Sequence, residues 1–142
     1  MERCVVCRYI ENPLLINGLK FDLRIYVAVT SFFPLRVFIY EEGLARFATE
    51  TYRDDAYKNP FIHLTNYSIN KKSKKFALLN QDLEDDDLHE ASGSKWTLTA
   101  FRRFLRENRI DDSLLWTKIE ACVARSLLSI ENTCATGKRT FL

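Results

Sequence analysis

The sequence predicts an α+β fold in which an antiparallel β meander is followed by two or more helices. Two patterns predict the meander: polar and apolar residues alternate strictly over residues 20–27, and an Asn17-Gly18 pair stands just before them. The helices are predicted by apolar residues spaced three and four positions apart after residue 94. We therefore expect a single domain, with a mainly β core over residues 4–69 and helices over residues 94–131.

The strand predicted over residues 20–27 carries an unusual row of charges. Its even-numbered residues are Lys20, Asp22, Arg24 and Tyr26, and its odd-numbered residues are all apolar. Successive side chains of a strand point to opposite faces, so the apolar side is expected to pack against a core. The polar side has two interpretations. It is a solvated strand face, or it binds a phosphate-bearing ligand, because ammonium and guanidinium groups both hold phosphate oxygens.

Further strands are predicted on both sides of this one. The apolar run over residues 4–10 predicts a strand before it, and residues 35–40 and 44–48 predict two strands after it. Pro34 and the Glu-Glu-Gly segment over residues 41–43 are expected to form turns. Polar residues without a period then predict a loop over positions 49–60, followed by a short extended piece over positions 61–66.

A charged flexible loop is expected over residues 70–92. It begins with a basic stretch and continues into an acidic cluster at residues 82–87, and clusters of like charge are usually solvated. The basic stretch is named here the lysine cluster and consists of Lys71, Lys72, Lys74 and Lys75.

The last third of the chain predicts two helices and a tail. Ser94 suits the N-cap of the first helix, and Asn108 suits its end. Asp111 or Asp112 suits the N-cap of the second helix, whose apolar residues recur on one face. Residues 132–142 show no pattern and are expected to form a tail.

Composition narrows the class of protein. The 142 residues are 46% hydrophobic and 28% charged, which is typical of a soluble globular protein. The formal net charge of +2 is too small to indicate a nucleic-acid partner. No apolar run approaches the roughly 20 residues of a membrane-spanning helix, and the N-terminus lacks the apolar core of a signal peptide. We expect no nucleic acid, no membrane and a cytoplasmic setting.

The cysteines do not predict a metal site. Cys4 and Cys7 have the C-x-x-C spacing of half a zinc site or of a redox pair. Cys122 and Cys134 do not form a second such pair, and both histidines stand far from either pair in the sequence. Because four ligands are needed for a structural zinc site, we expect no metal bound by these residues.

Four separated blocks resemble the tubulin tyrosine ligase-like family, and most of all its glutamate-adding members. They occur in the family's order and are Arg8–Pro13, Lys20–Val27, Glu42–Phe47 and His63–Ser68. Residues 95–128 resemble the family more weakly, as a mostly helical stretch. The resemblance implies a partial ATP-grasp-like domain, of which this chain covers the middle.

The family resemblance implies an ATP-dependent protein–glutamate ligase of the tubulin polyglutamylase type. In that reaction ATP phosphorylates an acceptor carboxylate, and the amine of a free amino acid displaces the phosphate to form an amide. The implied partners are tubulin C-terminal tails or microtubules and free L-glutamate. The implied location is the cytoplasm and the cytoskeleton, with the cilium or basal body as a narrower option.

The resemblance also implies the residues of the site. Arg24 would lie near the reacting carboxylate as the catalytic residue. His63 belongs to the nucleotide-binding motif and is not included among the catalytic residues. The incoming glutamate would be bound by Arg46, Tyr67, Ser68 and Lys95. ATP would be bound by Cys7, Arg8, Tyr9, Ile10, Lys20, Asp22, Thr65 and Asn66.

The chain departs from the family in three respects. Cys7 replaces a Gln or Ser of some relatives, and neither an N-terminal subdomain nor the magnesium-binding motif is recognised. Mg²⁺ is therefore expected for a full-length enzyme, with ligands outside this chain, and the isolated chain is not expected to ligate. The alternative is a non-catalytic truncated paralogue that binds acidic tubulin tails or microtubules. A weaker alternative, a nucleic-acid binder, lacks aromatic residues interleaved with the lysine cluster.

Overall fold

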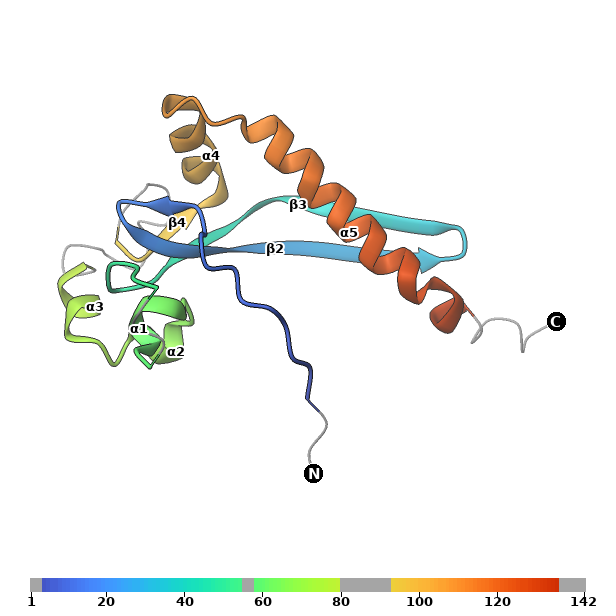
Figure 1. The fold of residues 1–142 in the computed structure, drawn as a ribbon. Helices are drawn as coiled ribbons and strands as arrows, with labels where there is room; N and C mark the ends of the chain where they lie inside the picture. Colours follow the sequence, from blue (N-terminus) through green and yellow to red (C-terminus); the bar gives the residue numbers. More distant parts are fainter. Residues whose placement is uncertain (1–3, 55–57, 80–92, 136–142) are drawn as a thin grey trace. The chain divides into compact units, whose positions relative to one another are not determined.

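The computed structural model describes residues 4–54, 58–79 and 93–135, which form a four-stranded sheet and five helices (Figure 1). The strands pair in the order β1-β2-β3-β4. They are β1 (Leu15–Ile16), β2 (Leu19–Phe32), β3 (Leu35–Phe47) and β4 (Lys95–Thr97). The helices are α1 (Pro60–His63), α2 (Tyr67–Asn70), α3 (Lys74–Leu79), α4 (Leu98–Glu107) and α5 (Asp112–Ala135).

The described residues pack into two compact units. The first unit comprises residues 4–22, 46–54, 58–79 and 93–94, and the second comprises residues 23–45 and 95–135. Each unit has its own buried apolar residues. Those of the first are Ile16, Phe47, Ala48 and Ile62, and those of the second are Ala45, Trp96, Leu98, Ala100, Phe101 and Leu105.

The β1–β2 hairpin confirms the turn predicted at Asn17-Gly18. Both residues have positive φ angles, 52° and 74°, which is the backbone that a two-residue type I′ turn requires. The turn sets an antiparallel register in which Ile16 faces Leu19 and Leu15 faces Lys20. The strand predicted over residues 20–27 is confirmed as part of β2, which continues to Phe32.

One strand prediction and one turn prediction in the first half of the chain are wrong. Residues 4–10 form no strand, and Val5 and Val6 are 89% and 90% exposed. An apolar run becomes a strand only where a neighbouring strand pairs with it, and residues 4–10 form no β-bridge with the parts of the chain that the structure describes. The turn expected over residues 41–43 is also absent, because β3 runs unbroken from Leu35 to Phe47.

The predictions for residues 61–79 are corrected as well. Residues 61–63 of the predicted extended piece belong instead to the short helix α1, because Asn59 Oδ1 accepts from the N–H of Phe61 and Pro60 stands at the first helical turn. Leu64 and Asn66 have extended backbone angles, as predicted. Lys71 and Lys72 lie in the turn after α2, as the loop prediction expects, whereas Lys74 and Lys75 form the start of α3 and correct it. The rest of the expected flexible loop, with its acidic cluster, lies outside the described residues.

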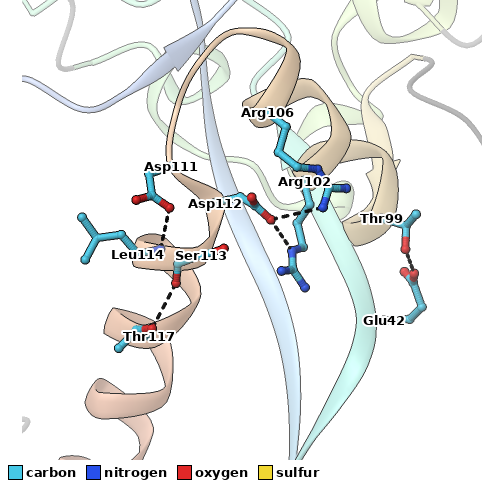
Figure 2. Close-up of polar contacts among 9 residues, drawn as sticks. All are labelled: Glu42, Thr99, Arg102, Arg106, Asp111, Asp112, Ser113, Leu114 and Thr117. Carbon is cyan, nitrogen blue, oxygen red and sulfur yellow. Dashed lines mark hydrogen bonds and ion pairs between the residues drawn. The ribbon is translucent and has the colours of Figure 1, made fainter.

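The second unit corrects one cap and confirms two others. Residues 95–97 form β4, and Thr97 caps α4 by accepting from the N–H of Ala100 at 3.1 Å, so the cap predicted at Ser94 is wrong. Asn108 ends α4 as predicted. Asp111 caps α5 as predicted, because its Oδ1 accepts from the N–H of Leu114 at 2.9 Å (Figure 2).

Charged side chains hold α4 against the start of α5 within the second unit. The buried carboxylate of Asp112 accepts from Arg102 Nε at 3.0 Å and lies 3.6 Å from Arg106 Nη1 (Figure 2). The Arg102 guanidinium also stands 5.0 Å from the centre of the Trp116 ring. None of the helices in the described residues is long and apolar enough to span a membrane.

Candidate functional site

The structure gathers most of the predicted site residues in the first unit. All but Arg24 and Lys95 belong to it, and they come from the segment before β1, the start of β2, the end of β3 and the α1–α2 region.

Asp22 on β2 and Arg46 on β3 form a two-point ion pair. Arg46 Nη2 donates to Asp22 Oδ2 at 2.5 Å, and Arg46 Nε donates to Asp22 Oδ1 at 3.1 Å. The two side chains keep 26% and 33% of their surface exposed. The sequence assigned the two residues to different ligands and did not predict that they pair. The pair shows that the Arg46 guanidinium can bind a carboxylate through two hydrogen bonds, because it binds that of Asp22 in this way.

Lys20 is fixed by two elements of the first unit. Its ammonium donates to the main-chain oxygen of His63 at 3.0 Å, and its own main-chain oxygen accepts from Ala48 at 2.8 Å. The side chain is partly exposed. An ammonium has three donor hydrogens, so the bond to His63 leaves donors for an anionic ligand.

His63 lies buried between two tyrosines. A hydrogen bond of 2.8 Å joins its Nδ1 to the hydroxyl of Tyr9, and the two rings meet edge to face with their centres 5.7 Å apart. The Tyr52 ring stands 5.6 Å from His63 in the same geometry. The Tyr52 hydroxyl donates to the main-chain oxygen of Glu11 at 2.8 Å. Sequence reasoning missed Tyr52, because it stands in a polar stretch with no motif around it.

A cavity of about 540 Å³ opens beside these residues. Its volume falls within the range of small-molecule pockets. It combines two of the blocks that the family resemblance assigned to ATP, although Cys7 does not line it. Its walls are Arg8, Tyr9, Ile10, Asn12, Pro13, Leu14, Lys20 and Phe21.

Thr65 and Asn66 of the second nucleotide motif lie between α1 and α2, and the proposed glutamate contacts Tyr67 and Ser68 form the start of α2. Thr65 is buried, whereas Asn66, Tyr67 and Ser68 are exposed. The neighbouring Asn70, which the sequence did not single out, is 1% exposed and donates from its side chain to the main-chain oxygen of Phe47 at 3.1 Å. That bond ties α2 to the end of β3 within the first unit.

Arg24 and Lys95 belong to the second unit. Arg24 is exposed on β2, and its guanidinium lies 5.6 Å from the centre of the Tyr26 ring. Lys95 is the first residue of β4 and is partly exposed. It therefore lies in a strand and not in a helix.

Metal-ligating side chains do not cluster in the parts of the chain that the structure describes. Among them there is no group of three or more His, Cys, Asp or Glu residues placed to hold a metal ion. All four cysteines are free and exposed.

Comparison with known proteins adds the family. Residues 1–140 match the model of the tubulin-tyrosine ligase family. The chain is 48% identical over 141 residues to tubulin polyglutamylase ttll-5 of Caenorhabditis elegans, covering 97% of this chain and 19% of that protein. It is 44% identical over 143 residues to tubulin polyglutamylase TTLL5 of Homo sapiens, covering 99% and 11%.

The chain is also similar to a tubulin monoglutamylase. The chain is 40% identical over 129 residues to tubulin monoglutamylase TTLL4 of Mus musculus, covering 89% of this chain and 10% of that protein. The chain thus spans between a tenth and a fifth of the length of these curated relatives. Because the family model covers nearly the whole chain, this protein belongs to the tubulin-tyrosine ligase family.

Proposed function

We propose that this chain forms part of an ATP-dependent ligase that adds glutamate to tubulin, within a domain of the ATP-grasp type. The observation that carries the proposal is the cavity of the first unit, whose walls include Arg8–Ile10 and Lys20. These are two blocks that the family resemblance assigns to ATP, and the fold brings them to one cavity. The names of the relatives, which are tubulin polyglutamylases and a monoglutamylase, support the substrate class.

The proposed reaction proceeds in two steps. An acceptor carboxylate oxygen attacks the γ-phosphorus of ATP, and ADP leaves, which gives an acylphosphate. The amine nitrogen of glutamate then attacks the acyl carbon, expels phosphate and loses a proton, which leaves an amide. Arg24 is the proposed catalytic residue, because a guanidinium stabilises the charge that develops on the reacting carboxylate.

The nucleotide is proposed to occupy the cavity of the first unit. Main-chain groups of Arg8–Ile10 would read the adenine edge, and the Lys20 ammonium would hold phosphate oxygens. Asp22 would accept from ribose hydroxyls, with Thr65 and Asn66 as further contacts. Mg²⁺ would supply additional charge to the phosphates in a full-length enzyme. The described residues form no carboxylate cluster for it, so we assign it no ligand here.

Glutamate is proposed to bind through its two carboxylates. The Arg46 fork, which holds the Asp22 carboxylate in this structure, is a ready partner for the α-carboxylate of glutamate. Tyr67, Ser68 and Lys95 are the proposed contacts to the rest of the amino acid. A lysine suits a substrate with a side-chain carboxylate, which favours glutamate over tyrosine.

Binding of ATP tests the proposal directly. We expect ATP at one hundred times its dissociation constant to raise the free energy of unfolding of the chain by about 2.7 kcal/mol, because the ligand binds only the native state. The Lys20→Ala variant should lose most of this gain, and Lys118→Ala, an exposed lysine of α5, should keep it. Thermal unfolding with and without ATP measures both. An unchanged wild-type midpoint at millimolar ATP would contradict the nucleotide site.

The exposed lysine cluster supports a second candidate function. Lys71, Lys72, Lys74 and Lys75 are all exposed on or beside α2 and α3 of the first unit. A non-catalytic product would use them to bind acidic tubulin tails or microtubules in the cytoplasm, the cytoskeleton or the cilium. Salt-sensitive sedimentation with microtubules, without any stabilisation by ATP, would favour this candidate over the ligase.

A further inference from the structure

The segment before β1 is held in place by side chains. Residues 4–10 have no strand partner among the described residues, and Val5, Val6 and Ile10 are largely exposed. Two hydrogen bonds fix the end of this run, at Tyr9 and at the following residue Glu11. One joins the Tyr9 hydroxyl to His63 Nδ1, and the other runs from the Tyr52 hydroxyl to the main-chain oxygen of Glu11.

His63 is the point at which these constraints meet. It is the last residue of α1 and is 9% exposed, so its own position is fixed by the first unit. Its ring contacts Tyr9 and Tyr52 edge to face, and its main-chain oxygen accepts from the Lys20 ammonium at 3.0 Å. One residue thus touches two walls of the 540 Å³ cavity, the Arg8–Ile10 segment and Lys20.

We propose that His63 is a positioning residue that sets the distance between these two walls. The imidazole fixes the segment that faces the adenine, and the main-chain oxygen of the same residue fixes the ammonium that faces the phosphates. This inference rests on the proposed function, because it takes the cavity to be the nucleotide site. It assigns His63 no proton transfer, since its Nδ1 is already bonded to Tyr9 and its ring lies between two tyrosines.

The first test removes the hydroxyl that His63 binds. Tyr9→Phe keeps the ring and loses one hydrogen bond, which should weaken ATP binding by the full chain about three- to tenfold. Binding of inorganic tripolyphosphate should not change, because it lacks the adenine. Calorimetric titration measures both ligands. Tyr40→Phe is the matched control, since Tyr40 is 64% exposed on β3 and belongs to no proposed site.

Two substitutions of His63 distinguish the effect of its hydrogen-bonding nitrogen from the effect of its size. His63→Asn places a polar atom near the position of Nδ1 and should bind ATP like the wild type, whereas His63→Leu should lose affinity as Tyr9→Phe does. Equal ATP affinity of wild type, Tyr9→Phe and His63→Leu would overturn the inference. If His63→Leu does not fold, Tyr9→Phe and His63→Asn still decide it.

A readout without nucleotide keeps this inference separate from the proposed function. Trypsin cleaves after Arg8, directly before Tyr9, and we expect Tyr9→Phe to speed that cleavage at least threefold as the segment is released. Peptides of residues 4–14 with Tyr or Phe correct for intrinsic preference. If the wild type fails to bind ATP, the proposed function fails, and faster cleavage still supports the positioning by His63. Unchanged cleavage together with unchanged ATP affinity would overturn it.

Discussion

The Asp22–Arg46 pair shows how a single contact changes the role of its residues. Each of the two has a proposed ligand of its own, and in the structure both carboxylate oxygens of Asp22 accept from Arg46. A carboxylate has about four acceptor sites and a guanidinium has five donor hydrogens, so the pair alone does not exclude either proposed ligand. The ion pair is thus compatible with a site for an amino acid, and Asp22 orients the guanidinium that receives it.

Replacing Arg46 with lysine separates the structural part of this pair from its binding part. Both side chains are partly exposed, so Arg46→Lys should lower the free energy of unfolding by no more than about 1 kcal/mol. Glutamate binding should weaken about tenfold or more, because an ammonium cannot form the two parallel bonds of a guanidinium. Urea unfolding and calorimetric titration with glutamate measure the two effects.

Arg36→Lys is the control for this substitution. Arg36 is also on β3, it is exposed, and it belongs to no proposed site, so both quantities should stay at the wild-type values. A loss of several kcal/mol in Arg46→Lys with unchanged glutamate binding would mean that the Asp22–Arg46 pair is structural only.

At the residue scale, the sequence predicted which residues line the cavity better than it predicted which residues they contact. The family blocks pointed to Lys20 and to the Arg8–Ile10 segment, and the fold places these at one cavity. No pattern indicated that His63 would connect them through Tyr9. Such contacts join residues that are far apart in the sequence and depend on how the whole unit packs. The pattern of a single sequence does not show which distant residues meet.

Gly43 explains why one strand element was mispredicted. The sequence treated it as the end of a turn, but it lies in the middle of β3, where it is buried. A Cβ added there would sit 2.3 Å from the main-chain oxygen of Arg24 on β2. The glycine therefore permits a close approach of two strands, which a sequence pattern does not distinguish from a turn.

Gly43→Ala should destabilise the second unit markedly. The atom that the new methyl group meets is main-chain oxygen, which cannot rotate away, so we expect a loss of about 2 kcal/mol or more in the free energy of unfolding. Gly18→Ala offers a graded comparison at φ +74°, where the left-handed backbone costs about 1–2 kcal/mol. Urea unfolding with circular dichroism measures both. Wild-type stability in Gly43→Ala would contradict the close approach.

Two elements with a local cause were predicted, and two with a distant cause were not. The Asn17-Gly18 turn and the cap at Asp111 are set by the residues themselves, and both are confirmed. The β4 strand has three residues and exists only because a neighbouring strand pairs with it, so the local pattern predicted a helix start instead. The opposite error occurred over residues 4–10, where the pattern predicted a strand but the described structure forms no β-bridge.

At the scale of the molecule, the charge distribution matters more than the net charge. The formal net charge is only +2, yet four lysines stand within five residues of one another on the first unit. Charges grouped in this way attract an acidic chain over about a Debye length, whereas scattered cations are largely offset by nearby anions. The lysine cluster begins three residues after Ser68. It therefore lies close in the sequence to Tyr67 and Ser68, the proposed contacts to glutamate.

Neutralising the lysine cluster should therefore weaken the binding of a Glu-rich peptide. We expect the fourfold substitution of these lysines by Gln to reduce affinity about tenfold at low salt and much less at 0.5 M salt, because screening shortens the attraction. A control variant removes the same charge from exposed cations elsewhere, by changing Lys58, Arg103, Lys118 and Arg125 to Gln. Fluorescence anisotropy of a labelled peptide measures both. If the two variants lose affinity equally, net charge alone attracts the peptide, and the lysine cluster is an ordinary solvated surface.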